Sequence, residues 1–330
     1  MLKAVYEERG PVPEDVIHAV ETETPAPGPG QVLVEVVAAP INPSDVLTLT
    51  GDYGMLPPLP AQGGNEGVGR VAALGEGAEG VSEGDIVLLP VGSGTWASHM
   101  VTEPRRLIPL PAGADPQQLS MITVNPPTAS LLLSEFVDLQ PGDWVIQNGA
   151  NSGVGGYLVQ LAAQRGIRTV NVVRRESAAE AVKAAGGDVV LVDGDHLAER
   201  VAEATGGAEI RLAIDAIGGE ATDHLADCLT EEGTLVNYGM MSGEPCMVSP
   251  KSIVFRDVRV RGFWLAKWFR NADRDRQKAL FGELTALIAQ GKLKARIHAT
   301  YDVGDIKQAV AEANAGGREG KVLVCPAHGG

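Results

Sequence analysis

The sequence is poor in cysteine and in positive charge, and each shortage excludes a class of protein. Cys228, Cys246 and Cys325 are the only cysteines among 330 residues, far apart and in no Cys-x-x-Cys spacing. Neither a disulfide framework nor a zinc cluster is therefore indicated, and we expect a reducing compartment. The formal net charge of -15 argues against a nucleic-acid partner, because phosphate backbones require clustered Lys and Arg.

Long hydrophobic runs are also missing. The first residues, Met-Leu-Lys-Ala-Val-Tyr, lead into no apolar stretch of signal-peptide length. No later run approaches the roughly 20 apolar residues that a membrane span needs. We therefore expect a soluble, cytoplasmic protein that has no membrane partner.

The residues that are abundant indicate an α/β protein in two domains. Hydrophobic residues make up 44% of the chain, aromatic residues only 4%, and glycine occurs 41 times, which is typical of parallel strands and their turns. The length exceeds the roughly 100 to 200 residues of a usual single domain. Up to about residue 120, short β-like runs such as 32–37 and 85–89 alternate with Gly- and Pro-rich turns, so this half is predicted to be mainly β.

After about residue 121 the pattern changes to apolar runs that alternate with helical patterns, which predicts βαβ units around a doubly wound parallel sheet. A helix is expected over 154–165, with Gly166 at its C-terminal end, and a second near 277–289. The β-like run 321–324 then returns the chain to the first domain. The strands of the parallel sheet are expected at 144–148, 169–173, 189–191, 212–215, 235–238 and 258–263.

A glycine-rich turn, Gly-Ala-Asn-Ser-Gly-Val-Gly at 149–155, lies between the first of these strands and the helix that follows it. Glycines at this point let the backbone approach a pyrophosphate at the positive end of the helix. The alternative is that they only tighten the packing of helix on strand. In the order strand, turn, helix, strand, the pattern favours dinucleotide binding.

The end of the second strand distinguishes NADP from NAD. An acidic residue there would accept hydrogen bonds from the ribose hydroxyl, but the chain reads Val173-Arg174-Arg175. Guanidinium groups hold a 2′-phosphate with charge-assisted hydrogen bonds. A solvated arginine pair on a loop is the alternative, and the position favours NADPH.

Seven sequence blocks resemble the mitochondrial-type 2-enoyl thioester reductases, a zinc-free branch of the medium-chain dehydrogenase/reductase superfamily. They follow the family's order from near residue 40 to near residue 265. The tyrosine block, the Asn-Ser-Gly-Val-Gly turn and the Phe-Trp-Leu block are the most specific. The blocks are Asn-Pro-Ser-Asp (42–45), Gly-Asp-Tyr-Gly (51–54), Gly-Gly-Asn-Glu-Gly (63–67), Val-Asn-Pro (124–126), Gln-Asn-Gly-Ala-Asn-Ser-Gly-Val-Gly (147–155), Asn-Val-Val-Arg (171–174) and Arg-Gly-Phe-Trp-Leu (261–265).

The resemblance implies a GroES-like catalytic domain at residues 1–122, an NADPH-binding Rossmann domain at 123–268, and a C-terminal segment, 269–330, that returns to the catalytic domain. It also implies a homodimer that pairs cofactor domains. Glu176 departs from the Arg-Asp-Arg trio of the family, which puts a third phosphate contact in doubt. The implied NADPH residues are Asn125, Asn151, Ser152, Gly153, Val154, Gly155, Arg174, Arg175, Tyr238, Gly239, Met240, Met241, Phe263, Trp264, Leu265 and Lys321.

Zinc ligands are missing where the zinc alcohol dehydrogenases of the superfamily carry them. Those enzymes have a Cys near the position of Asn42 and a His at that of Asn65, and a neutral amide has little affinity for zinc. The four-cysteine structural zinc lobe is absent too. We therefore expect no metal, and a reaction based on hydride transfer plus a proton donor.

Tyr53 is the proton donor that the resemblance selects. Reducing an activated C=C bond places negative charge on an enolate, which must be protonated at the α-carbon. A phenol with a reference pKa of about 10 is protonated at neutral pH and can donate. Without the resemblance, an ordinary tyrosine in a surface turn remains the alternative. Tyr6, Tyr157 and Tyr301 lie in strand-like or helical contexts and are interpreted as packing residues.

The predicted substrate is an enoyl thioester of coenzyme A or of an acyl carrier protein. Nine basic and three acidic residues lie between Lys251 and Lys278, and such a patch attracts an anionic carrier. A solvated helix face is the alternative interpretation of these charges. Two other functions fit the same turn: a zinc-free NADPH reductase of quinones or alkenals, and a non-catalytic NADPH-binding protein.

Overall fold

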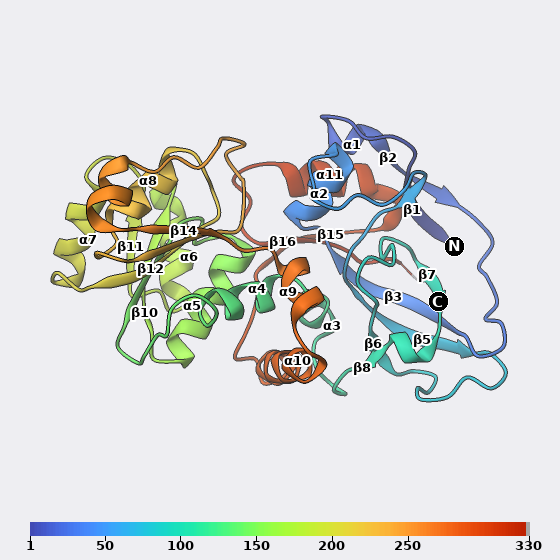
Figure 1. Ribbon diagram of the computed structural model, residues 1–330. Helices are drawn as coiled ribbons and strands as arrows, with labels where there is room; N and C mark the ends of the chain where they lie inside the picture. The colour runs from blue at the N-terminus through green and yellow to red at the C-terminus, as the bar shows by residue number, and fades with distance from the viewer. Residues whose placement is uncertain (328–330) are drawn as a thin grey trace. The chain divides into compact units, whose positions relative to one another are not determined.

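The computed structural model describes residues 1–327 and divides the chain into two compact units. The first unit combines Met1–Val124 with the chain from Phe281 onward, and the second is Asn125–Leu280. Figure 1 shows the two units and labels most of their elements. The predicted division into a catalytic domain at 1–122, an NADPH-binding domain at 123–268 and a returning C-terminal segment at 269–330 stays a prediction.

The second unit contains a six-stranded parallel sheet with the strand order β11-β10-β9-β12-β13-β14. The order reverses between β9 and β12, so right-handed crossovers place helices on opposite faces of the sheet. The predicted doubly wound fold is therefore confirmed. The strands are β9 (Trp144–Gln147), β10 (Arg168–Val173), β11 (Val189–Val192), β12 (Ile210–Asp215), β13 (Thr234–Asn237) and β14 (Arg259–Gly262).

The helices of this unit connect the strands, and the clearest begins at the glycine turn. In α5 (Gly153–Gln164) the buried side chains include Leu158, Leu161 and Ala162, an i, i+3, i+4 stripe that packs inward. Gly166, with φ +70°, follows its end as the sequence predicts. The other helices are α4 (Asn125–Leu132), α6 (Ala179–Ala184), α7 (Leu197–Thr205), α8 (Glu220–Asp227), α9 (Leu265–Asn271) and α10 (Arg274–Ala289), which contains the unit boundary, with short helical turns at Glu176–Ala178 and Lys251–Phe255.

The first unit is mainly β, as predicted. A seven-stranded sheet has the order β15-β16-β3-β5-β6-β8, with β7 also paired to β3, and a three-stranded sheet has the order β2-β1-β4. The strands are β1 (Leu2–Tyr6), β2 (Ile17–Glu21), β3 (Val32–Pro40), β4 (Ala61–Gln62), β5 (Val68–Leu74), β6 (Ile86–Leu88), β7 (His99–Thr102), β8 (Ile108–Pro109), β15 (Ile297–Tyr301) and β16 (Lys321–Val324). The helices are α1 (Pro13–Val16), α2 (Pro43–Thr50), α3 (Pro116–Leu119) and α11 (Ile306–Asn314), with short turns at Pro104–Arg106 and Val303–Asp305.

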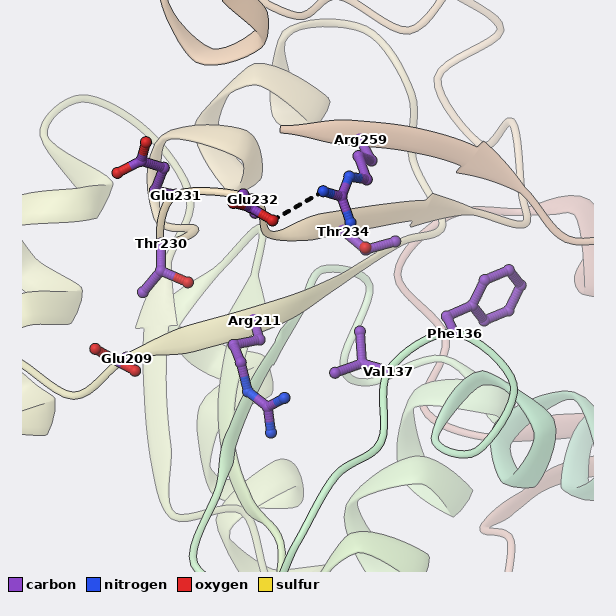
Figure 2. A pocket seen from close by; sticks show the side chains of 9 residues that line it. All are labelled: Phe136, Val137, Glu209, Arg211, Thr230, Glu231, Glu232, Thr234 and Arg259. Atoms are coloured by element: carbon purple, nitrogen blue, oxygen red, sulfur yellow. Dashed lines mark hydrogen bonds and ion pairs between the residues drawn. The ribbon is translucent and has the colours of Figure 1, made fainter. Parts of the chain in front are cut away.

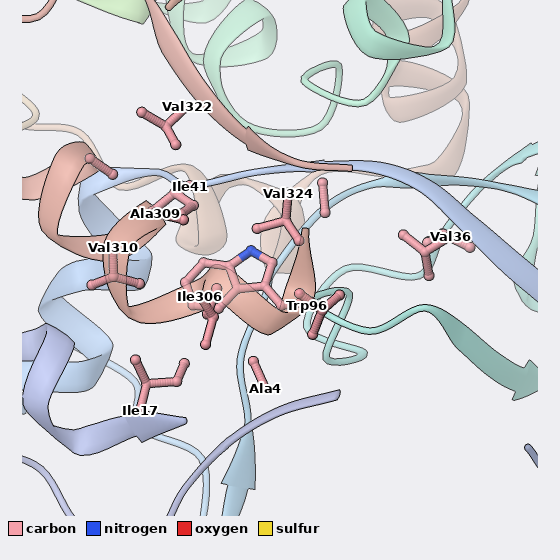
Figure 3. Close-up of a cluster of buried hydrophobic side chains, with 14 of the residues drawn as sticks. Ala4, Ile17, Val36, Ile41, Trp96, Ile306, Ala309, Val310, Val322 and Val324 are labelled. Carbon is pink, nitrogen blue, oxygen red and sulfur yellow. The ribbon is translucent and has the colours of Figure 1, made fainter. Parts of the chain in front are cut away.

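The core of the first unit joins the two ends of the sequence (Figure 3). Trp96 is fully buried there, and its indole N–H donates to the Pro40 carbonyl at 3.3 Å. Ile306 and Val310 of α11 lie in the same cluster as Ala4 and Ile17. Helix α11 presents its apolar positions at i, i+3 and i+4, so burial fixes it against the strands of the N-terminal half.

Candidate active site

The glycine turn after β9 has the geometry of a phosphate cradle. Gly149 has φ +57°, and a Cβ at Gly155 would stand 2.6 Å from the Ala150 carbonyl oxygen, so a side chain at 155 would clash. The Ser152 hydroxyl caps α5 by accepting the Gly155 N–H at 3.1 Å. Asn151 at the tip of the turn is exposed. The turn therefore presents backbone N–H groups at the positive end of a three-turn helix, which fits the pyrophosphate of a dinucleotide.

Arg174 and Arg175 follow the last residue of β10, at the same edge of the sheet as the glycine turn. Both side chains are exposed, and neither pairs with a carboxylate within residues 1–327. Glu176, which begins the next helical turn, is exposed as well. Two guanidinium groups without a protein partner fit the 2′-phosphate of NADPH.

Asp215, at the end of β12, organises this edge of the sheet and was missed by the sequence prediction. Its buried carboxylate accepts hydrogen bonds from the side chains of Asn148 (2.7 Å), Asn237 (2.9 Å) and Thr222 (2.8 Å). The Ile217 and Gly218 N–H groups donate to it as well, at 2.9 and 3.1 Å. Five donors thus fix the segments that follow β9, β12 and β13.

A second buried pair ties the glycine turn to β10. Gln147 donates through Nε2 to Asn171 Oδ1 at 2.8 Å and to the Gly155 carbonyl at 3.1 Å. Both amides are fully buried. They hold the start of α5 against the first two strands, which preorganises the turn.

The segment 238–241 follows β13. Burial raises the pKa of the Tyr238 phenol above its ordinary range; a hydrogen bond with Ser152 opposes this, and the Asp215 carboxylate reinforces it. A Cβ at Gly239 would stand 2.6 Å from the Ala216 carbonyl, so glycine is required there. Met240 and Met241 are exposed.

The predicted residues 263–265 follow β14. Phe263 packs edge-to-face on Phe136 with ring centroids 6.0 Å apart. The Arg270 guanidinium lies 5.0 Å from the ring centroid of Trp264. Leu265 begins α9, and Asn125 is buried at the start of α4. Strand ends therefore bring the turns at 149–155, 174–175, 238–241 and 263–265 to the carboxyl edge of one sheet, where dinucleotides bind in doubly wound folds.

Tyr53 lies just beyond the C-terminus of α2 in the first unit. Gly51 caps the helix with φ +95°, and the N–H groups of Gly51, Asp52 and Tyr53 all donate to the Leu47 carbonyl, at 3.0, 2.9 and 3.1 Å. The Tyr53 side chain is half-buried. The backbone of the tyrosine is thus held by the last turn of the helix, and the residue itself lies in the bend that follows.

A buried polar cluster occupies the other end of α2, and we call it the Asn42 cluster: Asn42, Asp45, Glu66, Thr123 and Lys321. Lys321 Nζ donates to Asn42 Oδ1 at 2.5 Å, and Asn42 Nδ2 donates to Glu66 Oε1 at 2.7 Å. Burial lowers the pKa of Lys321 to about 8, raises that of Asp45 to about 7 and also raises that of Glu66. Lys321 therefore bonds inside the first unit, and its predicted contact with NADPH stays a prediction.

The basic stretch between Lys251 and Lys278 is partly neutralised. Arg256 pairs with Asp227, Arg259 with Glu232, and Arg276 with Glu135, at 3.0, 2.9 and 2.5 Å. Six exposed cations of this stretch form no ion pair within residues 1–327: Lys251, Arg261, Lys267, Arg270, Arg274 and Lys278, the last four of which lie on α9 and α10.

The hollow in Figure 2 lies at the opposite end of the parallel strands from the cofactor turns. It has a volume of about 480 Å³ and includes Thr234 and Arg259, the first residues of β13 and β14. Arg259 is paired with Glu232 there, and Arg211 with Asp143. None of the predicted site residues lines this hollow.

Comparisons with known proteins define the class. Residues 28–112 match the family described as the alcohol dehydrogenase GroES-like domain, and residues 153–280 match the zinc-binding dehydrogenases. Together with the glycine turn at the edge of a doubly wound sheet, this makes the chain a medium-chain dehydrogenase/reductase. Within residues 1–327, no three His, Cys, Asp or Glu side chains gather as a metal site. Zinc-free chemistry stays a prediction.

Named relatives narrow the class. The mitochondrial enoyl-[acyl-carrier-protein] reductase of Rattus norvegicus is 38% identical over 304 residues, 90% of this chain and 82% of that protein. The Etr1p complex with NADP and crotonyl-CoA is 26% identical with a TM-score of 0.87, over 98% of this chain and 99% of that one. The Candida tropicalis Etr1p/Etr2p heterodimer, a mitochondrial 2-enoyl thioester reductase, is 27% identical with a TM-score of 0.84, over 98% and 99%. The chain belongs to the 2-enoyl thioester reductases, as its sequence blocks predict.

The predicted cytoplasmic location is wrong. The enoyl reductases that match over most of this chain carry mitochondrial names. The prediction rested on the search for apolar stretches, which does not detect mitochondrial targeting segments because these are amphipathic. Separately, none of the helices within residues 1–327 is both long and apolar enough to cross a membrane.

Proposed function

We propose that this protein reduces the C2=C3 double bond of trans-2-enoyl thioesters with NADPH, and that Tyr53 donates the proton. The observation that carries the proposal is the cofactor edge of the second unit, where a capped glycine turn lies beside two unpaired arginines. The relatives named as enoyl reductases support the substrate class.

The cofactor fits the residues at that edge. The N–H groups that begin α5 bind the pyrophosphate, and Arg174 with Arg175 binds the 2′-phosphate. Asp215 keeps the surrounding turns in place through its five donors. Bound NADPH supplies the hydride for C3 of the substrate.

Tyr53 completes the reduction at the neighbouring carbon. Addition at C3 leaves the negative charge on an enolate of the thioester, and the Tyr53 O–H bond breaks as a C–H bond forms at C2. The phenolate that remains takes a proton back from water. A neutral phenol performs this step without a metal. This agrees with the hydrogen bonds of the Asn42 amide, which accepts from Lys321 and donates to Glu66.

The test follows NADPH oxidation at 340 nm with crotonyl-CoA, with the crotonyl thioester of an acyl carrier protein, and with a quinone. We expect turnover of at least one thioester and little turnover of the quinone. Quinone turnover alone would identify a quinone reductase. Tight NADPH binding without turnover of any acceptor would leave a non-catalytic binding protein. The two thioester arms also show whether coenzyme A or the acyl carrier protein is the preferred carrier.

We also propose that the protein forms a homodimer through the edge of its parallel sheet. Among the described strands, β14 pairs with β13 alone, and all four of its residues are exposed. Val254, Phe255 and Val260 beside this edge are 69%, 76% and 44% exposed. An open strand edge with apolar neighbours is a template for pairing with a second copy.

Charge at this edge is expected to separate the subunits. The native chain should elute with twice its 34.4 kDa mass, and the Val254→Lys/Val260→Lys variant with the mass of one chain, because buried ammonium groups oppose strand pairing. Light scattering after size exclusion measures both. Val91→Lys, at a 57% exposed position of the first unit, is the matched control. A native monomer, or a dimer that survives the double substitution, refutes this interface.

A further inference from the structure

The Asn42 amide has a defined orientation between two opposite charges. Its Oδ1 accepts from the Lys321 ammonium at 2.5 Å, and its Nδ2 donates to the Glu66 carboxylate at 2.7 Å. The side chain is 1% exposed. The reversed amide would face each charge with the wrong atom, so the contacts admit one orientation.

Both ends of this chain of hydrogen bonds are fixed to other segments of the first unit. Glu66 Oε2 accepts from the Thr123 hydroxyl at 2.6 Å and from the Thr123 N–H at 3.0 Å. Lys321, at the start of β16, also donates to the Ile41 carbonyl at 3.1 Å. The amide is therefore a rigid anchor among segments that are far apart in the sequence.

Asn42 is also the residue from which α2 begins. Its backbone N–H donates to Asp45 Oδ2 at 2.8 Å in a capping box, and Pro43 occupies the first turn. The helix spans eight residues, Pro43–Thr50, or about 12 Å at 1.5 Å per residue. Its other end holds the Tyr53 backbone through the Leu47 carbonyl.

We infer that Asn42 is a positioning residue for Tyr53, and that helix α2 transmits its position from the Lys321–Asn42–Glu66 anchor to the phenol. This inference rests on the proposed function, because it requires Tyr53 to be the acid. An apolar residue at 42 could fill the space, but it could not fix the position of the helix along its axis or its rotation about that axis. The directional hydrogen bonds of Asn42 to two buried charged groups fix both the axial position and the rotation.

The isosteric change Asn42→Asp is expected to lower kcat for crotonyl thioester reduction about ten- to a hundredfold, because a displacement near 1 Å costs that much in a positioned reaction. It keeps the acceptor for Lys321 and replaces the donor to Glu66 by a repelling oxygen. The double variant Asn42→Asp/Glu66→Gln restores the hydrogen bond in the reverse direction, with the amide at 66 donating to the carboxylate at 42. It should recover most of the rate. Thr48→Val removes a hydrogen bond to the Ser44 carbonyl in the same helix and should leave the rate unchanged.

A double-mutant cycle with Tyr53→Phe separates positioning from general damage. If Asn42 acts through the phenol, Asn42→Asp should change the rate less than twofold once the phenol is gone. The same ten- to a hundredfold loss in both backgrounds overturns the inference and leaves the proposed function standing. If Tyr53→Phe alone has no effect, the inference falls together with the assignment of Tyr53, even though thioester reduction is observed. Should Asn42→Asp not fold, Thr123→Val, which removes one donor to Glu66, replaces it in the cycle under the same criteria.

Discussion

Tyr53→Phe lowers kcat for crotonyl thioester reduction by about 10² to 10⁴, the range that a general acid contributes. The aromatic ring remains, and the hydroxyl of the half-buried phenol, with its transferable proton, is lost. The dissociation constant for NADPH should not change, because the substitution leaves the glycine turn and the Arg174–Arg175 pair intact. Stopped-flow single turnover with saturating NADPH measures the chemical step directly.

The matched control is Tyr301→Phe, which removes a hydroxyl from a partly buried tyrosine in β15 of the same unit. It should keep the native rate. A Tyr53→Phe rate within twofold of native would show that another group, or water, protonates the enolate. The proposal of NADPH-dependent thioester reduction would survive that result, and the assignment of its acid would not.

The parallel sheet could be predicted from the sequence because its signal is local. Most of the predicted strands are apolar runs that lie between a turn and a helical pattern, and every predicted strand overlaps an observed one. Glycine and arginine positions at the strand ends are also local signals. They carry the cofactor prediction because parallel strands end at a common edge.

The polar interior could not be predicted in the same way. Asp215 ends an apolar strand and receives donors from positions 148, 217, 218, 222 and 237. Asn42, Glu66 and Lys321 meet from three separate segments. A buried polar residue is stable only when its partners are present, and those partners have no regular spacing in the sequence. The one available signal was a lone charge in an apolar run, as at Asp215 and Lys321.

The choice of cofactor provides the second large effect. Arg174→Ala/Arg175→Ala is expected to lower kcat/KM for NADPH about a hundredfold or more, because each charge-assisted hydrogen bond contributes about 1.5 to 3 kcal/mol. The value for NADH should change less than threefold, since NADH has no 2′-phosphate. The ratio of the two kcat/KM values is the decisive measurement, because damage to the fold would lower both together.

Arg168→Ala is the matched control at the opposite end of the same strand. That guanidinium lies 4.2 Å from the Trp144 ring centroid and pairs with Asp188 at 3.2 Å, so its loss should reduce stability without changing the ratio. The preference for NADPH should also weaken with rising salt, because the Debye length falls from about 10 Å at 0.1 M to about 3 Å at 1 M and exposed ion pairs weaken accordingly. The contrary outcome is that the Arg174→Ala/Arg175→Ala variant keeps the native ratio of kcat/KM for NADPH to kcat/KM for NADH. That result would show that the two arginines are a solvated pair and that the 2′-phosphate is bound elsewhere on the carboxyl edge of the sheet.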